Sequence, residues 1–95
     1  MTSREAYVEK MKAKLDEWNA SIARLEARAE GAGADMKDEI NNEIGRIKKY
    51  RDEASSRIKD VQSAGDDAWE DFKTGIEKSW ETLGEAFNSA MSRFE

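Results

Sequence analysis

Carboxylates are the side chains in this sequence that could carry acid–base or metal chemistry, because the chain contains neither histidine nor cysteine. That composition excludes the Ser-His-Asp and Cys-His arrangements of nucleophilic catalysis and the ordinary kinds of zinc site. Three glutamate pairs have the spacing of one helical turn: Glu26 and Glu30, Glu39 and Glu43, and Glu81 and Glu85. A carboxylate-bridged metal in a helical bundle normally also uses a Glu-x-x-His element, which is missing here. We interpret the pairs as solvated acidic faces, and we predict no catalytic residue and no metal site.

Two further groups have the composition of ion or phosphate sites. The acidic residues between positions 66 and 71 form the densest cluster, but the spaced Asp-x-Asp loop with a central glycine that binds calcium is absent. Gly31 and Gly33 match a phosphate loop only in composition, because no Lys-Ser or Lys-Thr follows them at the required place. The sequence therefore predicts no cofactor, no small-molecule substrate and no enzymatic activity.

Large apolar residues in the last third of the chain recur every eleven residues. The three series are Trp69, Trp80 and Met91; Phe72, Leu83 and Phe94; and Ile76 and Phe87. Eleven residues fill three turns at about 3.67 residues per turn, so the stripe stays aligned along one helix, predicted over about 67–94. Such a stripe needs a cover, which can be a partner helix, a bundle core or a lipid surface. We favour helix packing over a ligand-binding role for these aromatic residues.

The first stretch of the chain has the pattern of an amphipathic helix over about 3–31. Thr2 and Glu5 have the spacing of a capping box, which predicts a helix start near Ser3. Apolar residues then follow the 3-4 spacing of heptad a and d positions: Val8, Met11, Leu15, Trp18, Ile22, Leu25, Ala29 and Ala32. The predicted packing residues among them are Leu15, Trp18, Ile22 and Leu25.

A second helix is predicted over about 35–62. Its seam contains Ile40, Ile44, Ile47, Arg51, Ala54, Ile58 and Val61, and the isoleucines and Val61 are its predicted packing residues. Arg51 takes a position where an apolar residue is expected. Two alternatives are open for it: the side chain snorkels to water, or the guanidinium meets an acidic residue across an interface.

The two junctions between these helices differ in clarity. At residues 31–35, Gly33 could end one helix and Asp35 could cap the next. A continuous rod is the alternative, because Met36, Ile40, Ile44 and Ile47 step by 4, 4 and 3 and keep the seam unbroken. At the second junction the break is plainer, with Gly65 expected to end the helix and Asp66 or Asp67 to cap the next one. The expected fold is a single all-α domain over 1–95, either an antiparallel three-helix bundle or a long coiled-coil rod with a third C-terminal helix.

The supply of apolar side chains is thin for a chain of 95 residues, of which 39% are charged. A small core seldom supplies more than about 3–5 kcal/mol, and natural small domains add disulfides, metals or oligomerisation. Without cysteine and histidine, oligomerisation is the supplement left, so we expect a homo-oligomer. No run of about 18 apolar residues could span a bilayer, and no signal-peptide pattern is present. The lack of cysteine fits a reducing cytoplasm.

The net charge of −5 is concentrated in one part of the chain. Residues 1–62 carry equal numbers of basic and acidic groups, so the whole excess lies on residues 63–95 with the eleven-residue repeat. An acidic face argues against nucleic acid, which is bound mainly through Lys and Arg on phosphates. It also argues against strong binding to anionic lipid. A membrane surface is therefore the weaker of the two ways of covering the aromatic stripe.

Two stretches carry a resemblance to a known group of proteins. They are REAYVEKMKAKLDEWNA at residues 4–20 and GDDAWEDFKTGIEKSW at residues 65–80. Together they resemble small bacterial coiled-coil-domain proteins of poorly assigned function, some of them labelled stress-response proteins. The resemblance implies an unbroken middle helix, from which this sequence departs at Gly31 and Gly33, and it implies no active site. The eleven-residue repeat is also similar to those of apolipoproteins and desiccation-protective proteins.

Two hypotheses about function follow. The first is a non-enzymatic, self-associating coiled-coil or helical-bundle protein with a stress-related role. The second is a peripheral protein that protects lipid or membrane surfaces through the amphipathic helix at residues 69–94.

Overall fold

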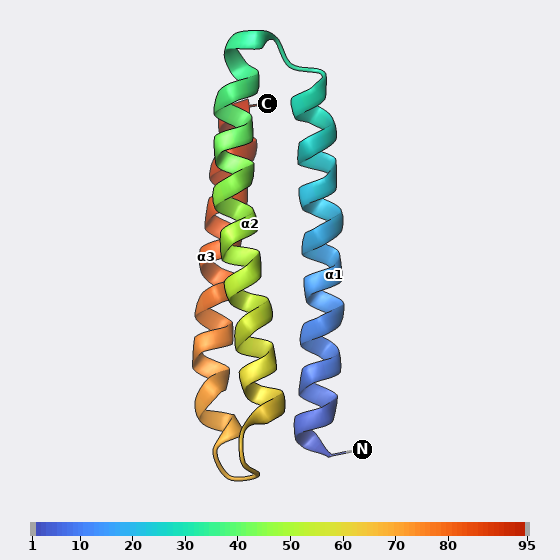
Figure 1. Ribbon diagram of the computed structural model, residues 1–95, viewed down its shortest axis with the longest axis vertical. Helices are drawn as coiled ribbons and strands as arrows, with labels where there is room; N and C mark the ends of the chain where they lie inside the picture. Colours follow the sequence, from blue (N-terminus) through green and yellow to red (C-terminus); the bar gives the residue numbers. More distant parts are fainter. Residues whose placement is uncertain (1, 95) are drawn as a thin grey trace.

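The computed structural model describes residues 2–94, with side chains described for residues 2–93. Three α-helices follow one another: α1 (Ser3–Glu30), α2 (Ala34–Ser63) and α3 (Lys73–Phe94), with a short 3-10 helix, η1 (Trp69–Phe72), directly before α3. The described residues contain no strand, which confirms the predicted all-α class. The helices alternate in direction and form an antiparallel bundle of 51 × 19 × 17 Å (Figure 1). Of the two architectures left open by the sequence, the chain has the bundle.

The start of α1 is the capped end that the sequence predicts. Thr2 has extended backbone angles (φ −76°, ψ 163°), and its hydroxyl accepts a hydrogen bond of 3.1 Å from the backbone N–H of Glu5. That bond satisfies one of the N–H groups that a helix leaves unpaired at its first turn. The predicted start at Ser3 is confirmed.

The turn between α1 and α2 consists of Gly31, Ala32 and Gly33. Gly31 caps α1 with helical angles (φ −87°, ψ −2°), whereas Gly33 is extended (φ −65°, ψ 160°) and precedes α2. The predicted cap by Asp35 is wrong, because Gly33 is the N-cap and no side chain bonds to this helix end. Asp35 lies in the first turn of α2 instead, where the positive end of the helix dipole stabilises its negative charge.

The second junction also differs in detail from the prediction. Helix α2 is capped by Ala64, whose N–H donates to the carbonyl of Asp60 at 3.0 Å, and Gly65 follows that cap. The prediction that Asp66 or Asp67 caps the next helix is wrong, because η1 begins after Ala68 without a side-chain cap. A backbone group takes the place of the side-chain cap, because the carbonyl of Gly65 accepts a hydrogen bond of 3.0 Å from the N–H of Ala68, directly before η1.

The core runs along the axis of the bundle and draws on all three helices. Its most enclosed large side chains are Ile22, Leu25, Ile47, Val61, Ile76 and Leu83. Small residues complete it, because Ala54 and Ala90 are 0% exposed. No helix in the described part of the chain combines the length and the apolar character needed to cross a bilayer.

Candidate functional site: the packing surface of the first helix

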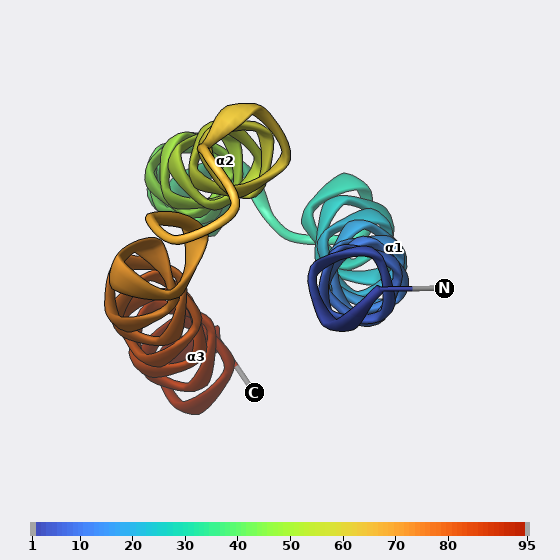
Figure 2. The same ribbon diagram turned by 90° about the horizontal axis from the view of Figure 1, so that it is seen from below.

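Helix α1 lies beside α2 and is set apart from α3. The backbones of α1 and α2 approach closely at many points, as do those of α2 and α3, whereas α1 and α3 come close at very few (Figure 2). Helix α2 is therefore the central element of the bundle. Any contact between α1 and α3 must be made by long side chains that cross a wider space.

The structure brings most of the predicted packing residues into one core. Eleven are buried: Ile22, Leu25, Ile40, Ile44, Ile47, Ile58, Val61, Trp69, Ile76, Trp80 and Leu83. Three more, Leu15, Trp18 and Phe87, are half-buried and pack against that core. The aromatic stripe of the last third is thus covered largely within a single chain.

Two of the predicted residues stand apart from this core. Phe72 is 40% exposed. The eleven-residue stripe assumes α-helical winding throughout, but residues 69–72 form a 3-10 helix with about three residues per turn. Trp69 stays buried in this 3-10 helix, whereas Phe72 at its end is turned away from the buried face. Phe94 was expected to pack as well, and its side chain lies outside the described residues.

Aromatic and sulfur-containing side chains cross the space between α1 and α3. Trp18 meets Phe87 edge-on, with ring centroids 5.5 Å apart and an interplanar angle of 73°. The indole N–H of Trp80 donates to the sulfur of Met11 at 3.0 Å, which gives this buried polar group a partner. Edge-to-face aromatic pairs contribute roughly 0.5–1.5 kcal/mol beyond their buried area, so the Trp18–Phe87 pair helps to hold the two helices together.

A third crossing lies at the end of the bundle where α1 begins. Tyr7 and Trp69 have ring centroids 5.9 Å apart, and the ammonium group of Lys73 lies 5.2 Å from the Tyr7 ring and 4.4 Å from the Trp69 ring. The hydroxyl of Tyr7 is buried and has no hydrogen-bond partner. Burial, and to a lesser extent the negative charge of Glu77, raise the pKa of Tyr7 above its usual value of 10.0.

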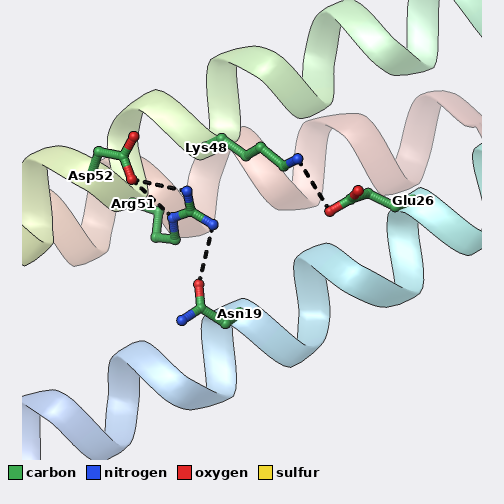
Figure 3. Close-up of polar contacts among 5 residues, drawn as sticks. All are labelled: Asn19, Glu26, Lys48, Arg51 and Asp52. Carbon is green, nitrogen blue, oxygen red and sulfur yellow. Dashed lines mark hydrogen bonds and ion pairs between the residues drawn. The ribbon is translucent and has the colours of Figure 1, made fainter.

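Polar side chains link α1 to α2 at the edge of the core (Figure 3). The ammonium group of Lys48 lies 3.4 Å from the carboxylate of Glu26. Arg51 donates to the side-chain oxygen of Asn19 at 3.3 Å and to Asp52 of its own helix at 2.9 Å. One of the two alternatives for Arg51 is wrong, because the group that it meets across the interface is an amide and not an acid. The other agrees with the structure, since the side chain is 27% exposed and its hydrogen bonds to Asn19 and Asp52 are exposed.

Several carboxylates singled out in the sequence take part in ion pairs. Glu39 and Glu43 both face Arg93, at 3.9 Å and 3.3 Å. Asp66 lies 3.3 Å from Arg4, which also donates to the carbonyl of Ala64 and so ties the start of α1 to the second junction. Within the described residues, no three acidic side chains gather as a metal site would require. These contacts stabilise local geometry, and they do not place an acid beside a base around a reacting group.

Sequence reasoning passed over several residues of the packing surface. Tyr7 lies one helical turn before Met11 on the stripe that faces α3. Nothing in the sequence around Tyr7 predicts that its hydroxyl is buried without a hydrogen-bond partner. Ser79 and Ala90 are buried and lie eleven residues apart, so the period that identified the tryptophans also marks them. The hydroxyl of Ser79 donates to the carbonyl of Gly75 at 3.0 Å, which explains how a polar residue is tolerated there.

Comparison with known proteins adds no relative to this description. No family model matches the chain, and neither a curated protein nor a solved structure matches it.

Proposed function

We propose that this chain is a non-enzymatic helical-bundle protein that works by associating with further copies of itself. The observation that carries the proposal is the incomplete cover on the side where α1 faces α3. Trp18, Phe87 and Met91 are only half-buried there, although each packs against the core. A second chain that covered them would remove apolar surface from water, which contributes a stabilising free energy of about 25 cal/mol per Å². So small a core needs such a supplement to its stability.

The non-enzymatic part of the proposal rests on the chemistry of the side chains. The chain has no histidine or cysteine, and several of its carboxylates lie in ion pairs, such as that of Glu26 with Lys48. A stress-related role is supported by the resemblance of residues 4–20 and 65–80 to bacterial coiled-coil proteins that carry this label. A cytoplasmic location is supported by the lack of cysteine.

The lipid-surface alternative has weaker support. Trp69 and Trp80 are 8% and 7% exposed, so binding through residues 69–94 would first require α3 to leave the bundle. Tryptophan fluorescence with neutral and anionic vesicles tests it, since insertion would shift the emission to shorter wavelength.

Sedimentation velocity and light scattering over a wide range of concentration test self-association directly. We expect the weight-average mass to rise from the 10.8 kDa of one chain towards twice that value. A mass that stays at 10.8 kDa at every concentration would contradict the proposal.

A further inference from the structure

The turn between α1 and α2 is close to helical geometry. Gly31 already has right-handed helical angles, and Gly33 departs from them in ψ (160°) but not in φ (−65°). Neither glycine has a positive φ. A Cβ atom added at Gly33 would meet nothing within 4 Å, and one at Gly31 would touch only the carbonyl oxygen of Arg28 at 3.7 Å. No steric reason therefore demands glycine at either position, and their main effect is to disfavour a continuous helix.

The apolar seam continues across this turn. Ala29, Ala32, Met36 and Ile40 step by 3, 4 and 4 residues, which is the spacing of one helical face. Met36 is a large hydrophobic residue that is exposed in the bundle, at 39%. Met36 already lies one turn before Ile40 on α2, so if residues 31–33 became helical, Ala29 and Ala32 of α1 would continue the face that Met36 and Ile40 share. In the continuous helix, Met36 would therefore belong to one apolar face that a partner chain could cover, whereas the bundle leaves its side chain exposed to water.

Helix α1 can leave the bundle without breaking the close backbone packing between α2 and α3. It packs closely on α2 alone, and side chains such as Met11 and Trp18 make its contacts with α3. The α2–α3 hairpin keeps its own close packing without α1. An α1 from a second copy would fit the vacated surface with the same contacts, because its sequence is the same.

We propose that two copies of this chain associate by exchanging α1, with residues 31–33 becoming helical so that α1 and α2 of each copy form one long helix. This inference rests on the proposed self-association and adds a second way of associating, because an exchanged α1 repeats the contacts of the single chain and leaves the half-buried side chains between α1 and α3 open to a further copy. Residues 3–63 in one helix would span about 90 Å at about 1.5 Å per residue, compared with 51 Å for the longest axis of the bundle. The α1 segment of each copy would pack on α2 and α3 of the other, in the antiparallel arrangement of the single chain.

Two opposite changes at the turn test this route. Gly31→Ala with Gly33→Ala favours the continuous helix, and a decrease of at least about tenfold in the dimer Kd is expected from the helix propensities, because the change acts in both chains. Ala34→Pro favours the turn, because proline suits the first residue of a helix and the residue before it prefers the extended angles of Gly33. In a continuous helix the same proline would remove an N–H donor and clash with the preceding turn, so the dimer is expected to weaken at least tenfold.

Gly45→Ala is the matched control. Gly45 lies inside α2 and a Cβ atom there meets nothing within 4 Å, so the substitution strengthens the helix without touching the turn. Its dimer Kd should stay within about twofold of the parent value, because it acts on the same helix in both forms. Far-UV circular dichroism checks that each variant is folded.

Crosslinking reports which chain supplies α1. Glu26 of α1 and Lys48 of α2 face each other across the interface (Figure 3), and the chain has no cysteine of its own. In a Glu26→Cys, Lys48→Cys variant, a short bis-maleimide should join two chains in the isolated dimer fraction and should stay within one chain in the monomer fraction. Small-angle scattering of the same dimer should give a maximum dimension near the length of the long helix.

The outcomes separate the two proposals. A tighter dimer with the alanines, a weaker one with the proline and crosslinks between chains would support the exchange. A dimer whose Kd is unchanged by both the alanine and the proline substitutions, and which crosslinks only within chains, would overturn the exchange but not the proposed self-association. A monomer at every concentration in all variants would overturn both.

Discussion

The indole N–H of Trp80 donates to the thioether sulfur of Met11 across 69 residues of sequence, at a distance of 3.0 Å. The pair lies in the core between α1 and α3, where water cannot replace a lost partner. Sulfur is a weak acceptor, but it is the group that this buried donor has. The hydrogen bond therefore favours one way for α1 and α3 to face each other, in addition to the apolar contact that the two side chains make.

Met11→Leu should destabilise the protein although it conserves volume. The substitution leaves the indole N–H unpaired, and an unsatisfied buried donor costs about 1–3 kcal/mol, with the lower end expected for a weak acceptor. Met91→Leu is the control, because the sulfur of Met91 accepts from Arg28 at 3.7 Å in an exposed setting. Urea unfolding measures both. Equal losses of unfolding free energy in the two variants would show that the Trp80 bond contributes nothing specific.

Tyr7→Phe should stabilise the protein. The hydroxyl of Tyr7 is buried without a partner, so removing it relieves a desolvation cost of roughly 1 kcal/mol while keeping the ring contact with Trp69. Thermal unfolding would show this as an increase in Tm of several degrees, since about 4–8 °C accompanies each kcal/mol in a domain of this size. A lower Tm would mean that the hydroxyl finds a partner in solution.

The same tyrosine should give the protein a pH dependence above pH 10. Its pKa is raised in the folded state, first by burial and then by Glu77, so the folded state favours the neutral phenol. The resulting stability is fully present below the unfolded pKa of about 10 and is lost as pH rises through the folded pKa. Unfolding free energy should therefore fall more steeply from pH 9 to pH 11 in the parent than in Tyr7→Phe. Parallel curves would argue against the shift.

Ile47→Ala should cost the most of the single changes considered. Ile47 is 0% exposed in the central helix, and truncating such a side chain costs about 2–5 kcal/mol through lost burial and the cavity left behind. Met36→Ala is the matched control on the same helix, because Met36 is 39% exposed, and its cost should be below about 1 kcal/mol. Chemical unfolding at low temperature measures both variants, and similar costs would contradict the assigned position of α2.

Glu26→Gln should have little effect on stability. Its ion pair with Lys48 is formed by side chains that are 46% and 40% exposed, and exposed pairs contribute about 0–1 kcal/mol. The small loss should shrink further as salt is added, because ions screen the attraction. A loss above about 2 kcal/mol that persists in high salt would show that the pair is more deeply enclosed than the structure indicates.

Periodicity predicted the helices and much of the core, because burial of one helical face imposes a repeat that survives in the sequence. The steps between Ile40, Ile44 and Ile47 identify three residues that the structure buries. The cap of α1 by the Thr2 hydroxyl was equally visible, since Thr2 and Glu5 are close in sequence.

Features that depend on partners distant in sequence could not be predicted in this way. No local pattern says that Trp80 finds the sulfur of Met11, or that Arg51 meets Asn19. The predicted side-chain caps at the two junctions were wrong for another reason. Acidic residues stood at plausible places, but the helices end and begin there with backbone hydrogen bonds. Phe72 failed because a change from 3-10 to α winding leaves no mark in the spacing of residues.

The odd number of helices places the first and last described residues at opposite ends of the long axis (Figure 1). A force applied between these ends would slide α1 along α2 and α2 along α3, so that many side chains resist together. Forces that pull neighbouring helices apart from one end would instead meet the contacts one turn at a time. Separating the two ends of the chain along the bundle axis would therefore require more side-chain contacts to break at once than peeling one helix from an end.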